Sequence, residues 1–254
     1  MTIRRIFPVF LTASAGALAL LLSAPTAASA YPIVGAPELT HNPLYTVPAL
    51  PSVSCKAVKG TTKASTTAYL KKIIGCLNTA WGKRVKEFVP AGLDIRNTLP
   101  GPCSSGLTVS GSAATSCYRS VQVQLRSDWI RARSELPVLV EVTRAYAQFV
   151  QSQTGISEAW WALRYDGEEA EMNEQTHRFY QQSDCLTGVS LKSLGRTARD
   201  WGPLLSAETP KEYDRFIPKW YGRPANRLAW FKTGYNTAKP GACNTWKAPS
   251  PKVA

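Results

Sequence analysis

The segment LPVLVEVTRAYAQFVQSQ, residues 136–153, decides the fold expected of this 254-residue chain. Its large apolar side chains recur every three or four residues, which places them on one face of a helix. Gly155 follows as a stop signal, because glycine readily adopts the left-handed conformation that ends many helices. The segment therefore predicts a long helix with a buried stripe. The stripe consists of Leu139, Val142, Tyr146, Phe149 and Val150.

Further helices are expected on both sides of this segment. Residues 66–89 repeat apolar side chains at helical spacing, and a similar pattern predicts helices at 169–188 and 224–234. A shorter segment surrounds residues 196–205. Helix is therefore the main secondary structure expected of the chain.

A small sheet is expected between the first two helices. Residues 90–116 are rich in Gly, Pro, Ser and Thr, which predicts loops and strands. Residues 118–125 then alternate, with Val121, Val123 and Leu125 on one face. These patterns predict one mainly helical α+β domain with a small sheet.

The two ends of the chain differ from this domain. Residues 1–30 have the basic start, short apolar core and small-residue cleavage site of a secretory signal peptide. Residues 31–54 are Pro-rich and predict an extended arm, residues 55–246 form the domain, and residues 247–254 predict a disordered tail. We expect a secreted, extracellular protein with no later membrane span. An uncleaved N-terminal anchor is the alternative.

The cysteines fit an exported protein. An even number of them in an oxidising compartment predicts disulfides. Short loops favour Cys55–Cys76 and Cys103–Cys117, which leaves Cys185–Cys243 as a long-range bridge, although spacing alone leaves other pairings open. A cysteine zinc site is the alternative, but the chain has no C-x-x-C pair.

The formal net charge is +13, or +11 once Arg4 and Arg5 leave with the signal peptide. Such a basic surface is drawn to anionic partners. Outside a cell these are wall polymers, lipid headgroups or acidic proteins, so we expect no nucleic-acid partner and consider wall association. The alternative is that the charge only aids solubility.

Short motifs stand near both ends of the chain that follows the predicted signal peptide. Residues 42–45 read N-P-L-Y, and residues 76–81 fit C-L-x-x-A-W. Residues 227–235 fit R-x-x-W-F-x-x-G-Y, and residues 243–246 are close to C-D-T-W/F. These motifs resemble signatures of the bacterial neutral zinc metallopeptidases. The resemblance implies a secreted peptidase with a zincin-like fold and a zinc cofactor.

The metal-binding motif of that family is replaced in this chain. The family's helix H-E-Y-G-H-H-V-Q corresponds to residues 144–151, so Arg144 and Gln148 replace the implied histidine ligands and Ala145 the implied catalytic glutamate. Zinc needs neutral imidazoles on one helix face, and a fixed arginine charge repels a divalent cation. We therefore expect no bound zinc and no peptidase chemistry at these positions.

The next family motif, E-L-Q-A-D-C, corresponds to residues 180–185. Tyr180 replaces the glutamate that the resemblance implies as the third zinc ligand, whereas Asp184 and Cys185 match. After the signal peptide the chain has only His41 and His177, so no two-histidine helix motif exists in it.

Two other chemistries use His177. It could bind a metal together with Asp184, or serve as the base of a hydrolase triad with that carboxylate. Most metal sites need three or four donors, and the chain has no G-x-S-x-G motif, so we favour a structural histidine.

Two further clusters have a functional and a structural interpretation. The acidic residues from Asp166 to Glu174 could hold calcium or form a carboxylate pair, but they better fit a solvated helix start. The pairs Trp160-Trp161 and Trp220-Tyr221 could contact a carbohydrate or peptide, although aromatic residues more often pack in cores.

These observations favour a catalytically inactive, metallopeptidase-like protein that binds a peptide, wall component or partner protein in the former cleft. Its candidate binding residues are Arg144, Gln148, His177, Tyr180 and Asp184, with Arg144 expected to hold a carboxylate. An active peptidase with an unrecognised site and a basic surface-adhering structural protein are the alternatives.

Overall fold

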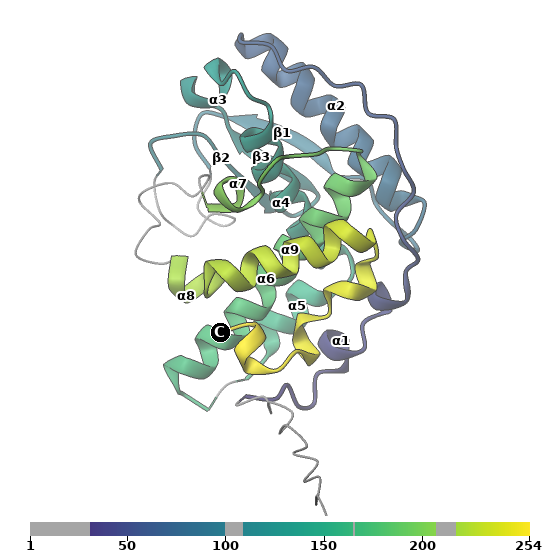
Figure 1. Cartoon of the computed structure of the whole chain (residues 1–254), viewed down its shortest axis with the longest axis vertical. Helices are drawn as coiled ribbons and strands as arrows, with labels where there is room; N and C mark the ends of the chain where they lie inside the picture. Colours follow the sequence, from purple (N-terminus) through teal and green to yellow (C-terminus); the bar gives the residue numbers. More distant parts are fainter. Residues whose placement is uncertain (1–30, 100–108, 165, 207–216) are drawn as a thin grey trace, which may run out of the picture.

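A computed structural model describes residues 31–99, 109–164, 166–206 and 217–254. The predicted signal peptide at residues 1–30 and Cys103 lie outside the described residues. The described chain is a mainly helical α+β fold with a small mixed sheet (Figure 1). This confirms the predicted mainly helical α+β class with a small sheet.

Helix α4 (Leu136–Gln153) confirms the central prediction, with the predicted bounds. Gly155 follows with φ 75°, the left-handed conformation expected of a helix stop. The predicted stripe is buried, and so are the polar residues Arg144 and Gln151 on other faces of the helix. Gln151 is satisfied because its amide donates to the Phe179 carbonyl at 3.0 Å. Helix α4 is therefore enclosed by protein on most sides.

Helix α6 (Glu169–Ser193) packs closely against α9 (Pro224–Thr237), and α6 also contacts α4. Both helices begin where the sequence predicted and continue beyond the predicted ends. Glycines allow the two backbones to approach, because a Cβ on Gly188 would lie 2.2 Å from the Phe231 carbonyl oxygen. Figure 1 shows α6 and α9 side by side near the centre of the molecule.

Gly234 gives the same close approach from the side of α9. A Cβ there would lie 1.9 Å from the Cys185 carbonyl oxygen, so Gly234→Ala must push the helices apart. We expect it to lower the free energy of unfolding by about 2–3 kcal/mol. Gly75→Ala, in the interior of helix α2 with nothing within 4 Å of the added carbon, is the control. It should stabilise by about 0.5–1 kcal/mol.

Urea unfolding followed by tryptophan fluorescence compares the two variants. Equal stability of Gly234→Ala and the unmodified protein would contradict the close α6–α9 packing described above.

Helix α2 (Lys63–Gly82) begins at Thr62, whose hydroxyl accepts from the Ser65 amide while the Ser65 hydroxyl accepts from the Thr62 amide. The helix ends before the predicted Val89. Its buried stripe stops at Trp81, and the polar residues that follow turn away, with Glu87 at φ 55°. The predicted helix was too long because its apolar pattern continues through Val85 and Phe88, which pack against the core after the helix has ended at Gly82.

The described strands form a sheet with the order β1-β3-β2. Strand β3 (Ser120–Gln124) lies in the middle, parallel to β1 (Gly92–Arg96) and antiparallel to β2 (Ala113–Cys117). Val121 and Val123 are fully buried, as the alternation predicted. Gln124 is buried as well, because its amide donates to the carbonyls of Val109 and Gly111. Strand β2 is an edge strand of this sheet, because the described strand that pairs with it is β3.

The arm at residues 31–54 is less extended than predicted. It contains a short helix α1 (Pro37–Thr40) and a 3₁₀ turn η1 (Pro43–Thr46). Leu39, Leu44 and Leu50 along it are buried in the core. Apolar residues between the prolines thus bind the arm to the domain.

The predicted disordered tail is wrong. Residues 245–252 form two 3₁₀ turns, η5 (Thr245–Lys247) and η6 (Ser250–Lys252), and Val253 is fully buried. The Gln181 amide donates to the Val253 carbonyl at 2.7 Å. Buried Arg178 donates to the carbonyls of Thr245 and Ala248 at 2.6 and 2.8 Å. In a free tail these backbone carbonyls would accept hydrogen bonds from water, and here they accept them from side chains of α6.

The remaining described elements are short. They are α3 (Ser127–Arg131), α5 (Ile156–Ala162), α7 (Gly202–Ser206), α8 (Ile217–Tyr221) and the 3₁₀ turn η4 (Pro240–Cys243). Among the described residues, no helix is both long and apolar enough to span a membrane.

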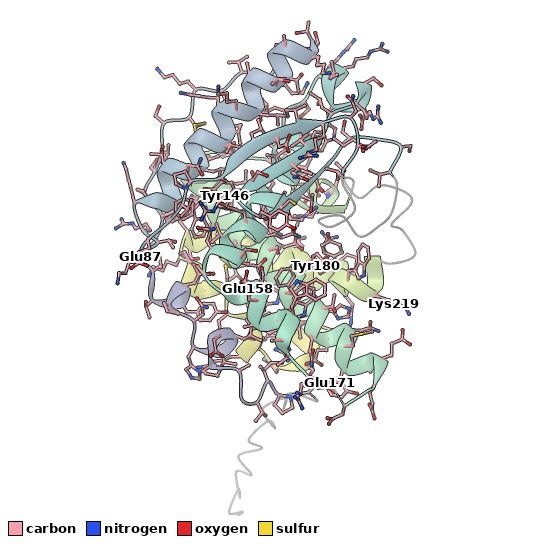
Figure 2. The ribbon with its side chains drawn as sticks, turned by 180° about the vertical axis from the view of Figure 1, so that it is seen from behind. Glu87, Tyr146, Glu158, Glu171, Tyr180 and Lys219 are labelled. Atoms are coloured by element: carbon pink, nitrogen blue, oxygen red, sulfur yellow. A yellow bond between two sulfur atoms is a disulfide. The ribbon has the colours of Figure 1, made fainter. Side chains whose placement is uncertain are left out.

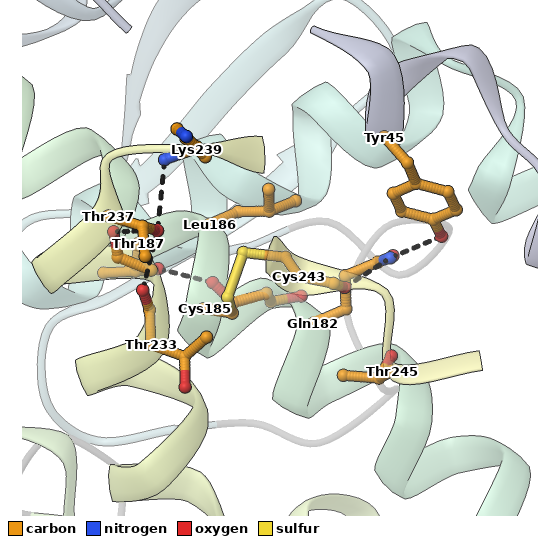
Figure 3. Close-up of a disulfide and its surroundings, with 12 residues drawn as sticks. Tyr45, Gln182, Cys185, Leu186, Thr187, Thr233, Thr237, Lys239, Cys243 and Thr245 are labelled. Carbon is orange, nitrogen blue, oxygen red and sulfur yellow. Dashed lines mark hydrogen bonds between the residues drawn. A yellow bond between two sulfur atoms is a disulfide. The ribbon is translucent and has the colours of Figure 1, made fainter. Parts of the chain in front are cut away.

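Two of the predicted disulfides, Cys55–Cys76 and Cys185–Cys243, lie within the described residues. The first fixes the end of the arm to α2. The second joins the middle of α6 to η4, and Figure 3 shows Gln182 beside it, where the Gln182 amide donates to the Cys243 carbonyl at 3.1 Å. The third predicted bridge includes Cys103, which the structure does not describe.

Candidate functional site

A cleft of about 830 Å³ is lined by residues of β2, α4, α5, α6 and α8. Three of the predicted binding residues line it: Arg144, Gln148 and Tyr180. Ala145 lines it as well. Figure 2 shows Tyr180 between the strands and the lower helices, with Lys219 at the outer margin. The other two predicted binding residues, His177 and Asp184, are not among the described residues that line the cleft.

Arg144 borders this cleft, but its guanidinium group is bound within the protein. Its Nη1 lies 2.6 Å from Glu141 Oε2, and its Nε lies 3.0 Å from Asp184 Oδ1. Its Nη2 donates to the Leu205 carbonyl at 3.2 Å, and only 3% of the side chain is exposed. Each guanidinium nitrogen already has a protein acceptor. The predicted role of Arg144 in holding a ligand carboxylate does not fit this geometry.

Arg227 of α9 approaches the same carboxylate from the other side. Its Nε lies 2.9 Å from Asp184 Oδ2, and its Nη2 donates to the Leu205 carbonyl at 3.0 Å. Asp184 is fully buried and bridges the two arginines. We call Glu141, Arg144, Asp184 and Arg227 the buried ion network. It contains two acids and two arginines and is neutral as a set.

Tyr221 of α8 covers the network. Its ring centroid lies 4.2 Å from Arg227 Cζ and 5.9 Å from Arg144 Cζ, which is cation–π geometry. Burial raises the pKa of the Tyr221 phenol to about 12, although the nearby arginines oppose the shift. The phenol therefore stays neutral over the physiological range.

The charges of the network are fixed by their neighbours. Burial raises the pKa of Glu141 above its ordinary value, and the Arg144 guanidinium opposes this shift. Burial lowers the pKa of Arg144, but the negative charges of Asp184 and Glu141 outweigh it and raise that pKa overall. Arg144 therefore stays cationic at any physiological pH.

Gln148 lies one turn further along α4. Its side chain is half-buried, lines the cleft and makes no hydrogen bond within the part of the chain that the structure describes. Its amide presents two donors and an acceptor to the cleft. Of the predicted binding residues on α4, Gln148 is the one available to a ligand.

Aromatic side chains cover much of the cleft. Trp160 stacks on Phe179 with ring centroids 4.1 Å apart, and Tyr180 stacks on Trp220 at 6.2 Å. Trp161, next to the first pair, is 78% exposed. Core packing explains Phe179, which is buried, but not the exposed indole of Trp161.

No family model, curated protein or solved structure matches this chain.

The residues at the implied zinc positions do not fit a zinc ion. Arg144 is a buried cation, Ala145 has no donor, and Gln148 and Tyr180 provide neither an imidazole nor a carboxylate. Asp184 is already bound by two arginines. The described residues contain no group of three or more His, Cys, Asp or Glu side chains placed to share a metal ion.

The histidines lie apart from these positions. His177 is half-buried beside Gly222 and is not among the described residues that line the cleft. Asp184 pairs with two arginines instead. The metal site and the hydrolase triad considered for His177 both need the Asp184 carboxylate, so neither fits this structure. His41 is exposed, with its Nδ1 2.8 Å from Thr40 Oγ1 and its Nε2 2.7 Å from Lys247 Nζ.

The acidic run at the start of α6 divides into two parts. Asp166, Glu168 and Glu169 are exposed, as expected of a solvated helix start. Glu174 is buried and pairs with Arg178 at 2.6 Å, which the sequence analysis missed. The spacing of four residues between them is the signal that could have predicted the pair.

The sequence patterns also did not predict the network roles of Glu141 and Arg227. Glu141 stands three residues before Arg144, a spacing at which side chains meet on a helix. Arg227 was noted only as part of a motif, and nothing in its local sequence places it against Asp184.

Proposed function

We propose that this chain is a secreted, metallopeptidase-like binding protein without peptidase activity. Its zincin-like fold is part of this proposal and rests on the sequence motifs. The disulfides support export, since such bonds persist in oxidising compartments. The ligand is a peptide, wall component or partner protein that enters the cleft.

The observation that carries the proposal is the buried ion network, which includes Arg144 at one of the implied zinc positions. The Arg144 guanidinium supplies the positive charge there, and the Glu141 and Asp184 carboxylates hold it in place. A hydrolytic metal site needs an open coordination position and a bound water. The network provides neither, but it keeps α4, α6 and α9 together beside an open cleft.

Metal content and proteolysis of the purified protein test the proposal. After incubation with zinc and removal of excess metal, we expect no stoichiometric zinc by mass spectrometry and no cleavage of casein. One zinc per chain with cleavage that a chelator abolishes would overturn it. Cleavage that resists chelators would support a hydrolase with an unrecognised site.

A restored variant provides the matched comparison. Arg144→His, Ala145→Glu, Gln148→His and Tyr180→Glu together return the family's ligand set, with circular dichroism to check folding. Zinc binding by this variant alone would support the motif resemblance. If the variant does not fold, the measurement on the unmodified protein still decides the proposal.

A further inference from the structure

The charged residues of the described cleft lining balance one another, although the protein is strongly basic. The charged side chains among the described residues that line it are Glu141, Arg144, Glu169 and Lys219. Glu141 pairs with Arg144 at 2.6 Å, and Glu169 forms a salt bridge with Lys219. The chain as a whole has a net charge of +13. Among the residues that the structure describes, the cleft therefore offers no unpaired cation to an anionic polymer or a peptide carboxylate.

The aromatic rings of the cleft provide flat apolar surfaces. Trp161 is 78% exposed at the end of α5, and its ring centroid lies 4.8 Å from that of half-buried Trp160. Tyr180 and Trp220 add a second, stacked pair from α6 and α8. Such surfaces bind flat ligands with an apolar face at a low cost in conformational entropy, because the rings have few rotatable bonds.

The polar lining is made of amides and hydroxyls. Gln148 has both donors and an acceptor without a partner in the described chain. Asn173 and Thr176 of α6 line the same cleft. A hydroxyl group also donates and accepts, so an uncommitted amide is complementary to it.

We propose that the cleft binds an uncharged carbohydrate chain. A sugar ring stacks with its C–H face on the exposed indole of Trp161, and its hydroxyls bind the Gln148 amide. The volume of about 830 Å³ is within the range of ligand sites and suits an oligosaccharide. This inference rests on the proposed function, because it assigns a ligand class to the same cleft.

Titration with defined oligosaccharides tests it. The probes are uncharged hexasaccharides of β-1,4-glucose, β-1,4-N-acetylglucosamine, β-1,4-mannose and α-1,4-glucose, with hexagalacturonate as the anionic comparison. Calorimetry at physiological salt should detect binding of at least one uncharged probe and none of hexagalacturonate. A protein that binds none of the uncharged probes at millimolar concentration would overturn the inference.

Variants locate the binding. Trp161→Ala and Gln148→Ala should each weaken the affinity about tenfold, whereas Trp161→Tyr keeps an aromatic face and should retain most of it. Val58→Ala is the control, since Val58 is 85% exposed and does not line the cleft. Binding that neither Trp161→Ala nor Gln148→Ala weakens would place the carbohydrate elsewhere and overturn the inference.

The outcomes separate this inference from the proposed function. The protein could instead capture peptides from a library, lose this capture in Trp161→Ala and bind no sugar. That result would overturn the carbohydrate ligand but support the cleft as a binding site. Zinc-dependent cleavage would overturn the proposed function, whichever sugars bind.

Discussion

Asp184→Asn is expected to lower the free energy of unfolding by about 3–5 kcal/mol. Asp184 is fully buried and accepts hydrogen bonds from Arg144 at 3.0 Å and Arg227 at 2.9 Å. An amide of the same size keeps the packing but removes the negative charge. Both guanidinium groups would remain buried with only the Glu141 carboxylate to balance them, and an uncompensated buried charge is costly.

An exposed ion pair provides the control for this prediction. Asp94 and Arg96 lie 2.6 Å apart, but their side chains are 36% and 43% exposed. Solvent screens such pairs, so Asp94→Asn should change stability by less than about 1 kcal/mol. Urea unfolding of both variants at neutral pH makes the comparison. The account of the network would fail if the two substitutions had equal effects.

The long elements of the fold could be predicted because their signals are local. Helix α4 has an apolar stripe and a glycine stop within its own sequence, and its predicted bounds are confirmed. The start of α9 at Pro224 is equally local, since proline fits the first turn of a helix. Periodicity and stop signals need no knowledge of the rest of the chain.

The arm at residues 31–54 and the C-terminal segment were predicted less well, because distant residues fix them. Nothing within residues 247–254 indicates order, yet Gln181 and Arg178, both on α6, bind backbone carbonyls of the C-terminal segment. Likewise, Leu39 is buried only because the arm packs against the domain. Such hydrogen bonds and contacts depend on the tertiary fold and leave no local pattern.

In the candidate site, too, some features could be predicted from the sequence and others depend on distant residues. The motif resemblance predicted that Arg144, Gln148 and Tyr180 meet, and they line one cleft. It did not predict that Arg227, far along the chain, would share Asp184 with Arg144. The partner of a buried charge decides whether that charge is available to a ligand, and sequence spacing reveals such partners only within a helix.

Removal of the Cys185–Cys243 disulfide is expected to cost about 4 kcal/mol of stability in the chain-entropy account. The bridge closes a loop with a sequence separation of 58, and both cysteines are fully buried. Without it, the unfolded chain gains the freedom of that loop. The double variant Cys185→Ala/Cys243→Ala, unfolded in urea, gives the value.

Cys55→Ala/Cys76→Ala is the matched control, because the same chemistry closes a loop with a separation of only 21. Loop entropy grows slowly with length, so we expect a cost of about 3 kcal/mol here. The larger loss should therefore follow removal of the bridge between α6 and η4.

The Cys185–Cys243 bridge also holds η4, which directly precedes residues 245–253, against α6. In the Cys185→Ala/Cys243→Ala variant, limited proteolysis should therefore cleave this C-terminal segment first. Earlier cleavage in the arm instead would show that the Cys185–Cys243 bridge is not what secures the C-terminal segment.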